Sequence, residues 1–142
     1  MPRVPDSFSP MPPRGAFIEA NGPFHHDGQL RFGFIPEDQH CNLLGFAHGG
    51  IIATLLDSAM THSVVTSHGY AVVTEQLKIE YASVVAKNRW AEVDVSLNER
   101  EGEQIWAKAV LSSRGQICAE GQASFKLLLR RPVLNGGRQA SN

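Results

Sequence analysis

The stretch AHGGIIATLLDSAM, Ala47 to Met60, decides the fold. It joins a glycine pair to an apolar run that contains one carboxylate, Asp57. That acid is the only formally charged side chain between residues 39 and 74 when histidine is counted as neutral. A lone charge in so apolar a segment is costly to bury, so it calls for a structural or a chemical role.

Apolar residues recur at helical spacing from Gly49 to about Ser67, over an arc wider than half the helix circumference. The sequence therefore predicts one long, mostly buried helix. Its remaining narrow face carries small or polar residues, namely Gly50, Thr54, Asp57 and Thr61.

Downstream of this helix the hydrophobic period changes to that of strands. Alternation predicts half-buried strands around residues 76–81, 91–97, 105–112 and 117–129, and a further strand at 29–35 precedes the helix. The connections NEREGE and SSRGQ have the composition of hairpin turns. Short connections require antiparallel pairing, so we expect an α+β fold in which a curved antiparallel sheet of about five strands wraps one central helix.

The 142 residues fit one domain with ends of different composition. Six of the 8 prolines fall within the first 23 residues, so residues 1–21 are expected to form a proline-rich arm, extended or irregular rather than helical. The domain proper should span residues 22–130, and residues 131–142 should form a flexible tail.

The charge and hydropathy patterns narrow the choice of partners. A net charge of -1 gives no general field for nucleic acid. No apolar run is long enough for a signal peptide or a membrane span, and the two cysteines lack the spacing of a disulfide or metal framework. We therefore expect a cytoplasmic protein that binds neither nucleic acid nor membrane.

The start of the predicted helix is a candidate site. Gly49 and Gly50 carry no side chains, so a ligand oxygen can approach the first N–H groups, which have no intrahelical acceptor. Such a terminus can bind an anion, or polarise a carbonyl and hold the oxyanion that forms on attack. A simple loop-to-helix entry is the alternative interpretation.

Asp57 lies eight residues after Gly49, or about 12 Å along one helix axis, so the two cannot serve the same carbon from one chain. A helix this poor in charge needs more cover than one sheet provides, and its small-residue face is expected to meet a second subunit. Two such helices packed antiparallel would place Asp57 of one beside the Gly49 terminus of the other. Burial would raise the pKa of this acid toward the range of a general base; a hydrogen-bonded structural acid is the alternative.

The segment HCNLLGFAHGGIIATLLDSAM resembles the signature of hotdog-fold acyl-CoA thioesterases of the phenylacetic-acid-degradation type, in the 4-hydroxybenzoyl-CoA thioesterase superfamily. The resemblance covers roughly residues 22–129. It implies hydrolysis of an aryl- or medium-chain acyl-CoA to the acid and free CoA, without a cofactor, by a homodimer that pairs into a homotetramer. The matching pattern N-x-x-G-x-x-H-G-G followed by L-x-D comprises Asn42, Gly45, His48, Gly49, Gly50, Leu55 and Asp57.

The resemblance also implies roles for single residues. The Gly49 N–H and the Asn42 side chain would polarise the thioester carbonyl, and Asp57 of the other subunit would activate water or attack directly. His48 would order the loop and contact the thioester, and Thr74 aligns with a hydroxyl that assists the acid. On strict alternation Thr74 faces the wrong way, so it reaches the site only if that face borders the interface or the strand bulges.

Coenzyme A brings phosphates, which local basic side chains would bind. We expect Gly50 and two or three cations to contact the substrate, with Lys87, Arg89 and Arg114 preferred over Lys126, Arg130 and Arg131. No histidine or cysteine has the spacing of a zinc site, so no metal is expected.

Two other functions remain open. A non-hydrolytic acyl-CoA binding or sensing module would keep Asp57 as a structural acid. A hotdog hydratase or dehydratase would need a paired acid and base, for which His48 and Asp57 are candidates. The presence of Asn42, the glycine pair and Asp57 together favours hydrolysis.

Overall fold

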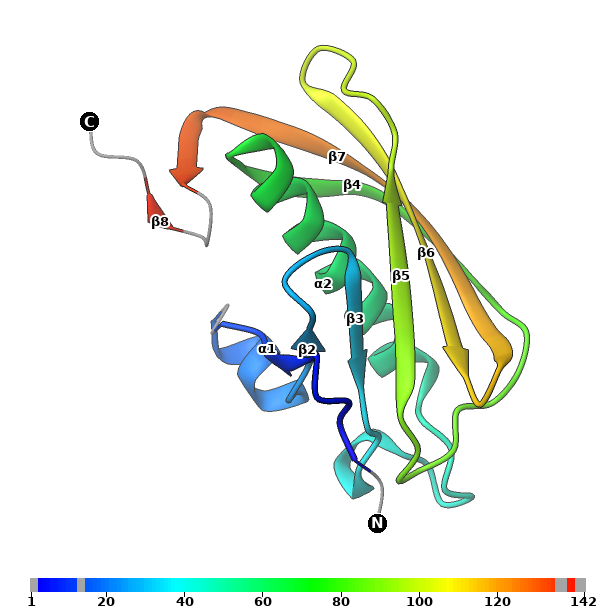
Figure 1. Cartoon of the computed structure of the whole chain (residues 1–142). Helices are drawn as coiled ribbons and strands as arrows, with labels where there is room; N and C mark the ends of the chain where they lie inside the picture. Colours follow the sequence, from blue (N-terminus) through cyan, green and yellow to red (C-terminus); the bar gives the residue numbers. More distant parts are fainter. Residues whose placement is uncertain (1–2, 13–14, 135–137, 140–142) are drawn as a thin grey trace.

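Figure 1 shows the computed structural model, which describes residues 3–12, 15–134 and 138–139. Within this part of the chain, one long helix lies against the concave face of a curved sheet. The elements follow in the order β1 (Ser9–Pro10), α1 (Ala16–Asn21), β2 (His25–His26), β3 (Arg31–Phe34), η1 (Asp38–His40), α2 (Gly49–His68), β4 (Tyr70–Tyr81), β5 (Ala91–Leu97), β6 (Gln104–Ser113), β7 (Gln116–Leu134) and β8 (Arg138–Gln139).

The sheet is antiparallel throughout, in the order β1-β2-β3-β5-β6-β7-β4, with β8 paired to β7. The predicted architecture of one helix wrapped by an antiparallel sheet is confirmed. The expected number of about five strands is too low, because eight are present among the described residues. Three of them, β1, β2 and β8, have 2 residues each, which is too short to produce a readable alternation in the sequence.

Helix α2 has 20 residues and matches the predicted helix closely. It ends at Gly69, whose φ of 76° is left-handed and whose N–H bonds to the carbonyl of Val65, and β4 begins at the next residue. The predicted apolar face of the helix is buried against the sheet. Its members are Ile51, Ile52, Leu55, Leu56, Ala59, Met60 and Val64.

Small residues on the sheet let α2 approach closely. Gly121 of β7 pairs across the sheet with Ala109 of β6. A Cβ at Gly121 would lie 3.1 Å from Ile79 Cδ1 and 3.3 Å from Leu56 Cδ1, closer than ordinary contact. The large helix side chains are therefore packed directly on the strands, and each fully buried one contributes about 1.5–3 kcal/mol.

The N-terminal arm differs from the expectation. Residues 16–21 form α1, so the prediction of an extended or irregular arm is wrong for this segment. The sequence AFIEAN contains no proline, and the breakers flank it instead of interrupting it. The arm is also attached to the sheet, because Ser9 of β1 pairs with His26 of β2.

The C-terminal region extends further than expected. The predicted boundary after residue 130 falls inside β7. The expected flexibility of residues 131–142 stays a prediction, since residues 135–137 and 140–142 lie outside the described part of the chain.

Candidate active site

The N-terminus of α2 is open to solvent. His48 is its N-cap residue, in extended conformation, and the His48 side chain makes no capping hydrogen bond. His48, Gly49 and Gly50 are all exposed. The first N–H groups of the helix have no intrahelical acceptor and carry partial positive charge. An incoming oxygen can therefore reach them without displacing a protein side chain.

Tyr81, at the end of β4, fixes the first helical residue. Its hydroxyl donates a hydrogen bond of 2.6 Å to the carbonyl of Gly49. A Cβ at Gly49 would lie 3.2 Å from the same hydroxyl, so a side chain here would require the tyrosine to shift by a few tenths of an ångström. Tyr81 was not predicted as a site residue, although its alternation with Leu77 and Ile79 already placed it on the same face of the strand as these two apolar residues.

The loop before the helix is held by the Asn42 side chain. Its carboxamide oxygen accepts hydrogen bonds from the N–H groups of Leu44 at 3.0 Å and Phe46 at 3.1 Å. Because the oxygen is occupied within the loop, the carboxamide nitrogen is the part of the side chain that can donate to a ligand. Asn42 is exposed, so this nitrogen is accessible.

A buried histidine connects this loop to the arm. His40 Nδ1 accepts a 2.9 Å hydrogen bond from the Glu37 N–H, so Nε2 carries the proton and donates to the Asn21 carbonyl at 2.7 Å. The His40 carbonyl in turn accepts from the His48 N–H at 2.9 Å. The end of α1 and the start of α2 are thus joined through one residue. This role of His40 was not predicted, because a core histidine has no sequence signature of its own.

Asp57 lies two helical turns further along, on the stripe of α2 that the sheet leaves uncovered. Its side chain is half-buried, and its carboxylate accepts a 2.9 Å hydrogen bond from the Thr74 hydroxyl. Burial raises the pKa of Asp57, while the hydrogen bond from Thr74 acts in the opposite direction. The acid is therefore held in one orientation and in a poorly solvated environment, as a proton acceptor near neutral pH requires.

A bulge in β4 brings Thr74 to Asp57. Thr74 is paired with Phe125 and Gln76 with Ser124, so Glu75 is an extra residue without a partner in β7. This extra residue reverses the alternation. Thr74 therefore faces the helix on the same side of the strand as Leu77, Ile79 and Tyr81. The bulge was one of the two conditions under which the sequence allowed Thr74 to reach the acid.

Within one chain, the helix terminus and the acid stay apart. Gly49 and Asp57 belong to the same straight element, about 12 Å apart along its axis. The stripe between them consists of small or polar residues and is partly exposed. The members of this open stripe are Gly50, Ala53, Thr54, Asp57, Ser58 and Thr61.

The edge of the sheet beside the open stripe is also unpaired. Among the described strands, β4 ends the path and pairs only with β7. Two large β4 side chains on the helix side are exposed there, Leu77 by 41% and Tyr81 by 53%. An open strand edge therefore lies next to an open helix stripe.

The preferred cations gather at the end of the molecule where α2 begins. The backbone N–H of Lys87 bonds to the Gly45 carbonyl at 2.8 Å, in the loop that leads into the helix. Arg89 and Arg114 are exposed, and the segments that carry them meet where the Ser113 hydroxyl donates to the Trp90 carbonyl at 2.9 Å.

Lys87 is partly engaged already, because its ammonium forms a 2.7 Å ion pair with Asp38 that raises the lysine pKa. The three other candidate cations lie near the opposite end of α2, where β7 pairs with the first residues of β4. These are Lys126, Arg130 and Arg131.

With this geometry in place, residues 44–106 match the model of the Thioesterase superfamily. A relative from Pseudomonas aeruginosa, named "Putative esterase PA0474", is 28% identical over 133 residues, which cover 89% of this chain and 99% of that protein. These matches support a hydrolase of the thioesterase kind in general.

Solved structures share the fold. The BH2602 protein from Bacillus halodurans, solved with CoA, superimposes with a TM-score of 0.72 at 25% identity, over 81% of this chain and 78% of that one. A mutant of the phenylacetic acid degradation protein PaaI from Thermus thermophilus gives 0.69 at 21% identity, over 79% of this chain and 98% of that one. The predicted resemblance to hotdog-fold thioesterases is thereby confirmed.

None of the helices among the described residues is long and apolar enough to cross a membrane. No group of three or more His, Cys, Asp or Glu side chains among these residues is arranged to hold a metal ion.

Proposed function

Because this chain has the hotdog fold and its residues 44–106 match the Thioesterase superfamily, we propose that it is an acyl-CoA thioesterase. It hydrolyses an aryl- or medium-chain acyl-CoA to a carboxylic acid and free CoA, without a cofactor. The observation that carries this proposal is the pair of complementary groups on α2. A half-buried carboxylate is oriented by Thr74, and two uncapped N–H groups open to solvent at the glycine pair.

The active unit is a homodimer, and pairs of dimers form a homotetramer. Asp57 is too far from Gly49 of its own chain to act on the same carbon. The open stripe of α2 and the unpaired edge of β4 provide a continuous surface for a twofold contact. Antiparallel contact of two stripes builds two sites, each with a helix terminus from one chain and an acid from the other.

The chemistry follows from these positions. The Gly49 N–H and the Asn42 amide nitrogen donate to the thioester oxygen and hold the negative charge that develops on it. Asp57 of the partner subunit takes a proton from water as the oxygen of that water bonds to the carbonyl carbon. The tetrahedral intermediate then breaks its C–S bond, and the CoA thiolate leaves and takes up the proton.

Asp57 could instead attack the carbonyl directly and form an anhydride that water opens. A single turnover in oxygen-18 water detects an anhydride that water opens at the Asp57 carbon. General-base catalysis places one solvent oxygen in the acid product. Water attack on the Asp57 carbon of an anhydride leaves the label in the protein.

The CoA phosphates bind at the end of the molecule where α2 begins. Arg89 and Arg114 are exposed there, and Lys87 can exchange its ion pair with Asp38 for a phosphate. Gly50 contacts the substrate through its backbone, and His48, the N-cap residue, flanks the thioester. The solved CoA complex of the BH2602 protein supports CoA as the carrier.

Thiol release from a panel of aryl-, medium- and long-chain acyl-CoAs tests the reaction. Turnover supports a thioesterase, binding without turnover supports the sensing module, and hydration of an enoyl-CoA supports the hydratase. The variant Asp57→Asn should lose turnover. The matched change Asp94→Asn, at an exposed acid that pairs with Arg31 on the outer sheet, should keep it.

Mixed subunits test the shared site. Asp57→Asn dimers and Gly49→Ala dimers are each expected to be nearly inactive. A mixed dimer has one site with both changes and one site with neither, so random mixing should restore about a quarter of the wild-type rate. Asn42→Ala serves as a second partner variant. Absence of recovery with both partners contradicts a site built from two chains.

A further inference from the structure

We propose that the N-terminal arm forms one wall of the acyl pocket and sets the length of acyl chain that the enzyme accepts. This inference rests on the proposed function, because it places the thioester carbon beside Asp57. The determining residues are Met11, in the arm, and Ile18, in α1. They act by dividing one apolar space into two compartments.

The first compartment adjoins the acid. It has a volume of about 240 Å³ and is lined by Met11 and Ile18 from the arm and by Asp57, Ser58, Thr61 and His62 from α2. At ~30 Å³ for each water molecule, this volume holds on the order of eight atoms of that size. An acyl group that begins at Asp57 and ends against the arm is thus of medium length, or a single aromatic ring with a short linker.

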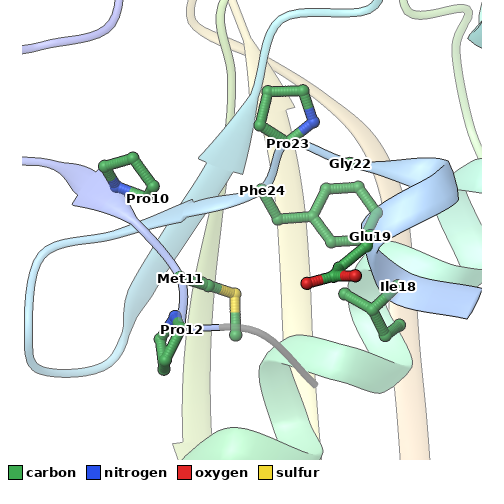
Figure 2. A pocket seen from close by; sticks show the side chains of 8 residues that line it. All are labelled: Pro10, Met11, Pro12, Ile18, Glu19, Gly22, Pro23 and Phe24. Carbon is green, nitrogen blue, oxygen red and sulfur yellow. The ribbon is translucent and has the colours of Figure 1, made fainter. Parts of the chain in front are cut away.

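The second compartment is lined in part by the same two residues. It has a volume of about 290 Å³, and Figure 2 shows the Met11 and Ile18 side chains together with the Phe24 ring at its walls. Met11 and Ile18 are the residues that line both spaces. In the proposal they form the partition between the two spaces, and this partition stops a longer chain.

The character of the second space defines what could enter it. Its lining is apolar apart from Glu19, whose carboxylate stands at the wall in Figure 2. A carboxylate at this position repels an acyl group with a second, terminal carboxylate. If the partition is removed, the added space accepts a longer, uncharged aliphatic chain.

Met11 and Ile18 pack against the core, and contacts that do not involve these two side chains also hold the arm in place. The Met11 N–H bonds to the Phe24 carbonyl at 2.9 Å, β1 pairs with β2, and buried His40 binds the carbonyl of Asn21 at 2.7 Å. None of these contacts uses the side chain of Met11 or Ile18. Truncating either side chain should therefore open the partition and leave the wall attached.

The test is an acyl-length profile. The kcat/KM for butanoyl-, octanoyl- and hexadecanoyl-CoA is measured for the wild type, Ile18→Ala, Met11→Ala and Ile18→Trp. Each alanine variant should raise the hexadecanoyl to octanoyl ratio about tenfold or more, because the fit of a few methylenes decides such ratios. Ile18→Trp should lower octanoyl turnover and leave butanoyl turnover near that of the wild type.

The matched control is Ile117→Ala, at an exposed isoleucine on the outer part of β7. It should leave the profile unchanged. A gain of activity on the longest substrate cannot result from misfolding, so loss of stability does not mimic the expected result. Equal profiles for Ile18→Ala, Met11→Ala and Ile117→Ala overturn the proposal.

A binding measurement keeps this inference separate from the proposed function. Calorimetric titration with CoA and with S-octyl-CoA, a thioether that cannot be hydrolysed, gives the contribution of the acyl part alone. If the wild type turns over no acyl-CoA, the proposed thioesterase activity is contradicted, but the proposal that the arm forms a wall of the acyl pocket is not. The proposed wall is supported if Ile18→Trp weakens the binding of S-octyl-CoA at least tenfold more than the binding of CoA. It is overturned if the two Kd values change equally.

Discussion

The two faces of α2 differ in composition and in the role that each has in the protein. The face toward the sheet carries Leu55, Leu56, Ala59 and Met60, all fully buried. The opposite stripe carries glycine, alanine, serine, threonine and one acid, and it is only partly covered. One helix thus holds the fold together on one side and leaves Asp57 and the helix terminus partly exposed on the other. Changes to the two faces should separate stability from activity.

The largest effect is expected on the open stripe. Asp57→Asn should lower kcat/KM by about 10²–10⁴, the usual contribution of a positioned base. Burial raises the pKa of Asp57, so the native state keeps this proton more firmly than the unfolded chain does. Stability therefore falls as pH rises through the window above the ordinary aspartate pKa.

Urea unfolding at neutral pH measures how Asp57→Asn changes the stability of the protein. Asparagine cannot ionise, so the variant should be as stable as the wild type or more stable. A large loss of stability would show that Asp57 is a structural acid, which would break the contrast between the two faces.

The next effect belongs to the buried face. Leu56→Ala removes a fully buried side chain that meets Gly121, and it should cost about 2–5 kcal/mol of unfolding free energy. The kcat of the folded fraction should change little, since the sheet side of α2 does not touch substrate. Urea unfolding, with activity corrected for the folded fraction, checks both expectations. A loss of kcat as large as that of Asp57→Asn would contradict the separation.

A smaller effect is expected where β4 supports the helix terminus. Tyr81→Phe removes the 2.6 Å hydrogen bond to the Gly49 carbonyl and should cost about 1 kcal/mol, or roughly fivefold in kcat/KM. Steady-state kinetics on one acyl-CoA measure it. Tyr70→Phe, at the opposite end of the same strand, is the control and should behave as the wild type. Equal losses in both variants would assign the effect to the strand rather than to the Gly49 contact.

The smallest effect is a displacement of the pH profile. The Thr74 hydroxyl lowers the pKa of Asp57, so Thr74→Val should raise that pKa further. Because the ionised form is the active one, the acidic limb of the kcat/KM profile should move to higher pH. Thr66→Val removes a hydroxyl that bonds within the helix, to the His62 carbonyl, and serves as the control. An unmoved limb in Thr74→Val would mean that this hydroxyl does not tune the acid.

Much of the fold could be predicted because its main elements are long and strongly periodic. The helix from Gly49 and the strand Ala91–Leu97 lie where the apolar spacing places them. The helix AFIEAN was missed because the surrounding prolines dominate the composition of the arm. The strands of 2 residues were missed because pairing, not sequence pattern, creates them.

The site residues also divide into those that the sequence could predict and those that it could not. Asn42, the glycine pair and Asp57 stand out as local patterns of residue type, and the structure places them in the loop and on the helix where the sequence indicated. The contributions of Tyr81 and His40 depend on tertiary contacts between distant segments. The direction of Thr74 depends on an unpaired Glu75, and a regular alternation cannot reveal such an insertion.

The extra residue in β4 has a consequence for the assembly. Thr74 and Tyr81 are separated by an odd number of positions, so an uninterrupted strand would turn one of them away from the helix. With Glu75 inserted, the same strand braces both the acid and the glycine terminus of its own chain. In the proposed dimer these two groups serve different substrates. Each β4 would then support residues of two active sites, and deleting Glu75 should impair both sites at once.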